Sequence, residues 1–127
     1  MLLRPNSVVA GRIKKLKFKD FTLGELEEVV LLTTLHCGDD AYLRFIGKSI
    51  TKLFERKISE GSVHMTLSRL EKKGLLESHY SSPTKMRGGR RKRLFKATNS
   101  GLQYLDFVLE RKLIIWEKLK RLKDESK

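Results

Sequence analysis

Apolar residues first recur at helical spacing from about residue 22. Over residues 23–36 they cover most of the circumference of a helix after its first turn, which predicts a helix central to the core. Thr22 and Glu25 have the spacing of a capping box, in which a hydroxyl and a carboxylate bind the unpaired N–H groups of a helix start. Gly38 is placed to end this helix.

A second helix is expected over about residues 40–56, with Asp39 or Asp40 as its N-cap. Its apolar side chains are expected to point inward: Tyr42, Phe45, Ile46, Ile50, Leu53 and Phe54. Cations repeat at every fourth residue on another face and form a basic stripe: Arg44, Lys48, Lys52 and Arg56.

Ser59 is the expected N-cap of a third helix, which runs to about Lys73 and stops at Gly74. Its core-facing stripe is Val63, Leu67 and Leu70. At 100° per residue, the side chains that point away from this stripe are Met65, Ser68, Arg69 and Lys72. These side chains are free to contact a partner.

Residues 75–82 and 92–97 are short strand candidates, and the glycine pair at 88–89 supports a hairpin between them. Thr98 is the expected cap of a last helix over about residues 99–123. The predicted order is three helices, a hairpin and a long helix, which is a mostly helical α+β fold.

The last helix carries more apolar surface than one domain can cover. From residue 102 to residue 122, twelve of twenty-one positions are apolar and form more than one stripe. One stripe can pack on the chain's own domain, so the remainder predicts a homodimer. The residues expected at the interface are Leu105, Leu109, Leu113, Trp116 and Leu119. Trp116 is expected to be an interface or core residue, and the alternative is a wall for a small aromatic effector between subunits.

The net charge adds a candidate partner to this fold. The 127 residues contain 28 Lys and Arg against 15 Asp and Glu, a net charge of +13, which favours a polyanionic partner. No run approaches the ~18 apolar residues of a spanning helix, so no membrane is expected. The single cysteine, Cys37, excludes an intrachain disulfide framework and suits a reducing compartment. We expect a cytoplasmic protein.

The hairpin is the most basic segment, with seven cations and no acid between residues 85 and 96. Cations at this density repel one another and need a compensating partner, which a phosphate backbone supplies. The alternatives are a solvated loop or a membrane-surface patch. Residues predicted to bind DNA phosphates are Lys72, Lys85, Arg87, Arg90, Arg91, Lys92 and Arg93. A helix with a polar outer face beside such a hairpin indicates a winged helix-turn-helix.

The third helix is expected to read the bases of double-stranded DNA in the major groove. The candidates are Ser62, His64, Met65, Ser68 and Arg69. An arginine can bind guanine O6 and N7, a methionine can contact the thymine methyl, and serine or histidine can hydrogen-bond bases or phosphates. Arg69 has an alternative, an ion pair with Glu71 or Glu55.

Three segments follow from these patterns. Residues 1–21 form a basic N-terminal arm, for which an organelle transit peptide is the rival interpretation. Residues 22–98 form the DNA-binding winged-helix domain, and residues 99–127 the dimerisation helix.

The chain also resembles the PadR family of winged-helix transcriptional regulators, over about residues 22–108. The most specific match is GSVHMTLSRLEKKGL at residues 61–75, followed by the basic hairpin in the expected order and spacing. Other matches are LGELE at 23–27, GGRRKRLF at 88–95 and TNSG at 98–101.

This resemblance implies a dimeric bacterial transcription regulator, usually a repressor, whose third helix enters the DNA major groove. Many members have tyrosine where this chain has His64, so a role of that tyrosine does not transfer. The N-terminal arm and the end of the last helix lie outside the family pattern.

No pattern of residues indicates catalysis. The motifs of serine hydrolases, phosphate-binding loops and zinc proteases are absent from the sequence. No Cys or His pairs have structural-zinc spacing. We therefore expect no enzymatic activity, no bound metal and no cofactor. The function predicted is a sequence-specific DNA-binding regulator that binds an inverted repeat as a homodimer. The rivals are a basic RNA-binding or ribosome-associated protein and an interaction adaptor that lacks the DNA contacts.

Overall fold

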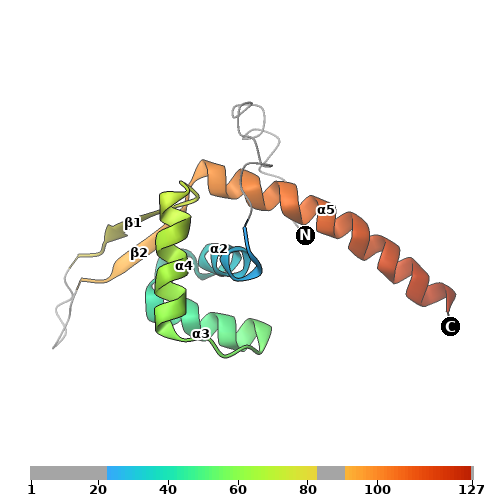
Figure 1. The fold of residues 1–127 in the computed structure, drawn as a ribbon, viewed down its shortest axis with the longest axis horizontal. Helices are drawn as coiled ribbons and strands as arrows, with labels where there is room; N and C mark the ends of the chain where they lie inside the picture. Colours follow the sequence, from blue (N-terminus) through green and yellow to red (C-terminus); the bar gives the residue numbers. More distant parts are fainter. Residues whose placement is uncertain (1–22, 83–90, 127) are drawn as a thin grey trace.

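The structure is a computed structural model that describes residues 23–82 and 91–126 (Figure 1). The order of its elements is the predicted one. They are α2 (Glu25–Cys37), the 3₁₀ turn η2 (Gly38–Asp40), α3 (Leu43–Phe54), α4 (Glu60–Lys72), β1 (Leu76–Tyr80), β2 (Arg93–Ala97) and α5 (Asn99–Glu125). The predicted arm, residues 1–21, and Thr22 lie outside the described residues.

The start of α2 differs from the predicted capping box by two residues. Its N-cap is Gly24, whose backbone N–H donates to Glu27 Oε1 at 3.1 Å. Glu25 is instead the first helical residue and pairs with Arg56. The predicted end of the helix is confirmed, because Gly38 has φ 59°, in the left-handed region that glycine adopts without strain.

The start of α3 is also corrected, since neither Asp39 nor Asp40 caps it. Both aspartates lie in η2, and the N-cap is the extended residue Tyr42. The Ala41 carbonyl accepts a hydrogen bond of 2.9 Å from the Phe95 N–H, and Tyr42 forms a bridge with β2. Because this short segment pairs with β2, the backbone stays extended through Tyr42 and the helix begins only at Leu43.

The predicted inward face of α3 is correct only at its centre. Ile46 and Ile50 are fully buried, whereas Phe45, Leu53 and Phe54 are exposed. Apolar residues at the flanks and the C-terminal end of a helix can fit the helical spacing although no neighbouring element covers them. An apolar strip is therefore left on the surface of α3.

The third helix and its caps are confirmed. Ser59 Oγ accepts a hydrogen bond from the Ser62 N–H at 3.1 Å, and Gly74 ends the segment with φ 76°. Val63, Leu67 and Leu70 are fully buried. Their burial turns the opposite face of α4 outward.

The two strands form the predicted antiparallel hairpin, in which Ser78 lies opposite Phe95 and Tyr80 opposite Arg93. Side chains alternate between the faces of a strand, so Arg93 and Phe95 share one face, and Leu94 and Lys96 share the other. Phe95 is buried against the helices. The arrangement of helices and hairpin is a winged helix-turn-helix.

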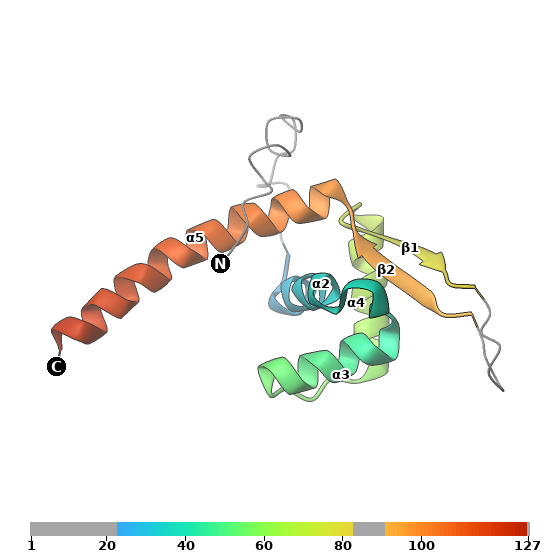
Figure 2. The ribbon, with the colours of Figure 1, turned by 180° about the vertical axis from the view of Figure 1, so that it is seen from behind.

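The last helix is confirmed and begins in close contact with the α4–β1 turn. Thr98 Oγ1 accepts from the Gly101 N–H at 3.1 Å and donates to the Gly74 carbonyl at 2.6 Å. The helix then leaves the domain, and its far half extends away from the other elements (Figure 2). Residues 111–126 are all exposed. At the start of this exposed part, Lys112 forms an ion pair with Glu28 of the domain.

An ion pair inside the domain makes stability depend on pH. The Lys73 ammonium lies 2.7 Å from Glu27 Oε2. Burial raises the pKa of Glu27, but hydrogen bonds from Lys73 and the Gly24 N–H, with the attraction of Lys73 and Arg69, outweigh it and hold the pKa below 4.5. A carboxylate with a lowered pKa stabilises the fold above its unfolded-state pKa, and this contribution disappears as the pH falls through the folded pKa.

Replacement of Glu27 with glutamine is therefore expected to lower the free energy of unfolding by about 1–2 kcal/mol at pH 7. The difference from the parent should shrink as the pH falls below about 4.5. Urea unfolding between pH 7 and pH 3 measures the free energy of unfolding of both proteins. The matched control is Glu77→Gln, because Glu77 lies on the exposed face of β1. Equal losses at pH 7 and pH 3 would contradict the assignment.

Candidate nucleic-acid interface

The outer face of α4 presents most of the predicted base-reading side chains to solvent. His64, Met65 and Arg69 are exposed, Met65 at 56% of its surface. Ser68 is half-buried. No described carboxylate forms an ion pair within 4 Å of Arg69, although Arg69 attracts Glu27 at longer range, and Glu71, one of its two predicted alternative partners, binds Arg93 instead. These four side chains lie on one continuous helix face.

Ser62 has a role in the helix start. Its backbone N–H donates to Ser59 Oγ, and its hydroxyl accepts a hydrogen bond of 3.0 Å from the same oxygen. Its carbonyl accepts from Thr66 Oγ1 at 2.7 Å. Ser62 therefore fixes the first turn of α4, next to the outward-facing His64.

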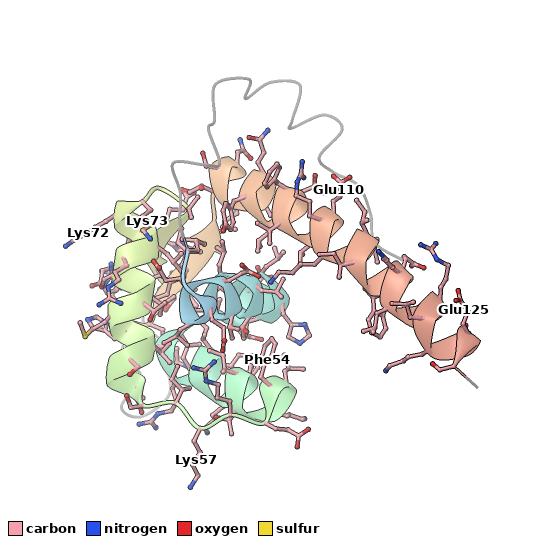
Figure 3. All side chains as sticks on the ribbon, turned by 45° about the vertical axis from the view of Figure 1, so that its right-hand side comes forward. Phe54, Lys57, Lys72, Lys73, Glu110 and Glu125 are labelled. Carbon is pink, nitrogen blue, oxygen red and sulfur yellow. The ribbon has the colours of Figure 1, made fainter. Side chains whose placement is uncertain are left out.

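The cations predicted to bind phosphate fall into three groups. Arg91 and Lys92 are exposed on the hairpin, and Lys72 points away from the core at the end of α4 (Figure 3). Lys92 Nζ lies 4.0 Å from the centre of the Tyr42 ring, a cation–π contact that leaves the ammonium at the surface. The remaining predicted cations lie outside the described residues: Lys85, Arg87 and Arg90.

Arg93 differs from the other hairpin cations because its guanidinium is held within the domain. Arg93 Nη2 donates to Glu71 Oε1 at 2.6 Å, and Nε donates to Ser78 Oγ at 3.1 Å. A charge that is already neutralised by a carboxylate releases few counterions on binding DNA. The prediction that Arg93 binds phosphate therefore does not fit its contacts.

A groove of about 670 Å³ separates α4 from the hairpin. Its lining combines the start of α3, the start of α4 and strand β2: Tyr42, Leu43, Arg44, Glu60, His64, Lys92, Arg93 and Phe95. Arg44 and Lys92 supply exposed cations on two sides of it. Arg44 Nε lies 3.7 Å from Glu60 Oε2, but both side chains are mostly exposed, so this pair is weak and, unlike that of Arg93, leaves the cation available to a phosphate.

Arg44 is a site residue that sequence reasoning missed. Its place in the basic stripe was evident, but the stripe runs the length of α3, and only pairing of residues 41–42 with β2 brings its first member beside the hairpin. The position of Arg44 at the helix start, where unpaired N–H groups favour anions, is a signal that could have singled it out.

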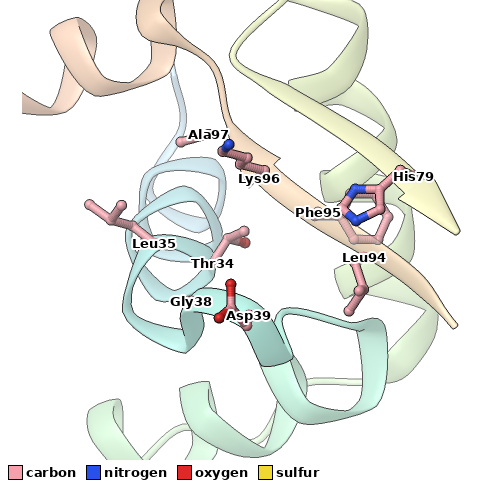
Figure 4. Close-up of a pocket in the computed structure, with 9 residues that line it drawn as sticks. All are labelled: Thr34, Leu35, Gly38, Asp39, His79, Leu94, Phe95, Lys96 and Ala97. Atoms are coloured by element: carbon pink, nitrogen blue, oxygen red, sulfur yellow. The ribbon is translucent and has the colours of Figure 1, made fainter. Parts of the chain in front are cut away.

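A second hollow, of about 510 Å³, lies between the end of α2 and the opposite face of the hairpin (Figure 4). Thr34, Leu35 and Asp39 line one side, and Leu94 and Lys96 the other. None of the predicted DNA-contacting residues lines it. Its three charged or titratable side chains, Asp39, His79 and Lys96, are all exposed, so it is an open surface hollow.

The residues predicted at a dimer interface divide into two groups. Leu105 is only 2% exposed and Leu109 packs against the core, so Leu105 has almost no surface for a second chain and the prediction is corrected there. Leu113, Trp116 and Leu119 are exposed, Trp116 at 49% of its surface. Periodicity alone could not separate the stripe that packs on the chain's own domain from the stripe beyond it.

Two further properties concern the described residues only. No group of three or more His, Cys, Asp or Glu side chains there is placed to hold a metal ion. Across residues 23–82 and 91–126, no helix combines the length and apolar character needed to cross a membrane.

Several solved structures share this fold. A PadR family transcription regulator from Clostridium difficile is 30% identical in sequence, over 78% of this chain and 95% of its own, with a TM-score of 0.52. A PadR-like transcription factor from Bacteroides fragilis is 19% identical over 91% and 98%, with a TM-score of 0.62. A PadR-like transcriptional regulator from Bacillus cereus is 21% identical over 76% and 89%, with a TM-score of 0.60.

No protein-family profile and no curated protein matches the chain. The two structures near 20% identity show the shared fold. The Clostridium regulator is matched over nearly its whole length and at higher identity than these two. The chain belongs to the PadR family of transcription regulators.

Proposed function

We propose that the protein is a sequence-specific DNA-binding regulator, a repressor that binds an inverted repeat as a homodimer. The observation that carries this proposal is the groove that brings His64, on the exposed face of α4, together with the cations Arg44 and Lys92. Membership of a family of transcription regulators supports it.

In this proposal α4 enters the major groove and the hairpin follows the adjacent backbone. Arg69 can bind guanine through O6 and N7, Met65 can contact a thymine methyl, and Ser68 or His64 can hydrogen-bond a base edge. Arg44, Lys72, Arg91 and Lys92 bind phosphates, and so do the three hairpin cations outside the described residues.

The exposed apolar residues of α5 supply the dimer contact. Leu113, Trp116 and Leu119 lie beyond the domain on a helix of 27 residues, where one chain leaves them uncovered. A two-fold dimer presents two α4 helices, which reach successive major grooves when the half-sites lie about 10 base pairs apart or a multiple of that. Trp116 is the residue proposed to contact a small aromatic effector, and quenching of its fluorescence would report such binding.

Selection of bound sequences from random duplex DNA tests the proposal. We expect recovery of an inverted repeat, which establishes both sequence preference and two-fold symmetry. A competition titration with structured RNA tests the RNA-binding rival in the same preparation. Preferential binding of RNA, or recovery of no preferred sequence, would reject the proposed function.

The base-reading role of α4 predicts a loss of specificity when its side chains are shortened. The double substitution Met65→Ala and Ser68→Ala should lower affinity for the selected operator by ~1–3 kcal/mol per lost base contact and spare binding to random DNA. Both affinities are measured by fluorescence anisotropy at one salt concentration. An unchanged ratio of operator to random affinity would show that α4 does not read sequence.

The hairpin cations are expected to contribute affinity without sequence preference. Arg91→Ala or Lys92→Ala should weaken all duplexes equally and reduce the slope of log K against log salt by about 0.9 per lost phosphate contact. Lys96→Ala is the matched control, because this exposed cation lies at the other end of β2 and lines the second hollow instead of the groove beside α4. A change of preferred sequence with an unchanged salt slope would contradict this role.

A further inference from the structure

Three side chains from three elements close a ring of hydrogen bonds. Glu71 lies in the last turn of α4, Ser78 in the middle of β1, and Arg93 at the start of β2. Ser78 Oγ donates to Glu71 Oε2 at 2.6 Å and accepts from Arg93 Nε at 3.1 Å, and Arg93 Nη2 donates to Glu71 Oε1 at 2.6 Å. Both carboxylate oxygens and two guanidinium nitrogens are engaged at once.

This ring is more constrained than an isolated surface ion pair. The side chains of Arg93 and Glu71 are 36% and 28% exposed, and the Arg93 guanidinium lies over the Phe95 ring, 5.1 Å from its centre. Exposed pairs between two flexible side chains stabilise little. Here a planar guanidinium is oriented by two hydrogen bonds and an aromatic face, which makes the link short, directional and stiff.

The ring lies between the two surfaces proposed to contact DNA. On α4, Arg69 and Lys72 flank Glu71 and point outward. On the hairpin, Lys92 precedes Arg93 and lines the groove opposite His64. The link therefore joins the element that carries the base-reading side chains directly to the strand that carries the phosphate-binding ones.

We propose that Glu71, Ser78 and Arg93 are positioning residues, which hold the hairpin at the angle to α4 that lets both contact one stretch of DNA. This inference rests on the proposed function. Two contacts on a stiff link bind as one unit, because the first brings the second to a high effective concentration, whereas a loose link loses that gain. Arg93 then strengthens DNA binding through Glu71 and Ser78, without contacting phosphate.

Removal of the Glu71 charge distinguishes a positioning role of Arg93 from direct binding of phosphate by Arg93. If Arg93 acted as a phosphate-binding cation, removal of the neighbouring carboxylate by Glu71→Ala would release its charge and tighten DNA binding. If the ring positions the hairpin, the same substitution weakens binding by about tenfold, a typical size for coupling within one hydrogen-bond network. The two accounts predict opposite signs.

Charge reversal provides the test, on the full-length protein with duplex DNA carrying the selected operator. Arg93→Glu should weaken binding by about tenfold or more, and the double variant Glu71→Arg with Arg93→Glu should return it to within about threefold of the parent. The Ser78 hydroxyl can donate and accept, so it serves the reversed pair. The matched control is Glu77→Arg with Arg93→Glu, which restores the same net charge on the exposed face of β1 and cannot close the ring. It should stay weak.

Equal recovery in both double variants, or tighter binding by Glu71→Ala, would overturn the inference while leaving the proposed function in place. A second measurement needs no DNA. Spin labels at Met65 and Arg91, in a Cys37→Ser background diluted with unlabelled protein, report the distance between helix and hairpin. The distance distribution should broaden in Arg93→Glu and narrow again only in the Glu71→Arg double variant. Unchanged distributions would overturn the positioning role even for a parent that binds no operator.

Discussion

Replacing Gly101 with alanine is expected to lower the free energy of unfolding by about 3 kcal/mol or more, because the new side chain has no space. A Cβ at this position would lie 2.2 Å from the Leu75 carbonyl oxygen and 3.2 Å from the carbonyl carbon. That oxygen accepts a hydrogen bond from the Thr98 N–H at 3.1 Å, so the α4–β1 turn and the start of α5 are fastened together there. Relief of the clash requires the two to move apart.

Urea unfolding measures this loss, and Gly61→Ala is the matched control. Gly61 lies in the first turn of α4, where the nearest atom to an added Cβ is 4.0 Å away. Alanine there gains helix propensity of up to about 1 kcal/mol and should not destabilise the fold. Equal stability of the parent and the Gly101 variant would mean that α5 does not begin in this contact.

Ending the chain after Glu110 is expected to convert the proposed homodimer into a monomer or an aggregate. The deletion removes Leu113, Trp116 and Leu119, exposed apolar residues of the helix beyond the domain. Two half-sites would then be bound independently, so operator affinity should fall by about a hundredfold or more. Sedimentation at micromolar concentration measures the mass, and a monomeric full-length protein would reject the dimer.

A pair of point variants separates loss of the interface from loss of helix length. Leu119→Asp replaces a member of the proposed interface and should give a monomer. Ile114→Asp makes the same kind of change on the other side of the helix, about 140° from Leu119 at 100° per residue, and should leave the dimer intact. Identical masses for the two variants would contradict this choice of interface.

Local chemistry explains which parts of the fold were predictable. Helix caps and left-handed glycines act on backbone groups within a few residues of themselves. The helix starts at Ser59 and Thr98 and the helix ends at Gly38 and Gly74 therefore lie where the sequence predicts them. The predicted start of α3 was wrong because β2, which lies more than fifty residues further along the chain, holds Tyr42 extended. No nearby residue signals that pairing.

The candidate site divides in the same way. The outward face of α4 follows from periodicity, since burial of Val63 and Leu67 determines where Met65 points. The role of Arg93 does not follow from its place among hairpin cations. Its two hydrogen-bonding partners come from α4 and β1, and only the folded arrangement distinguishes it from Lys92, its neighbour in sequence.

The packing of the first half of α5 on the domain makes the exposed residues 111–125 the arm of a lever, which is held up to about Leu109. This arm is about 22 Å long at 1.5 Å per residue, so a tilt of about 10° between the arm and the domain moves its far end by about 4 Å. That displacement is close to one base-pair step of about 3.4 Å. In the proposed dimer, a small change in how the first half of α5 packs on the domain would therefore alter which half-site spacing the two recognition helices can span, with every DNA-contacting side chain left unchanged.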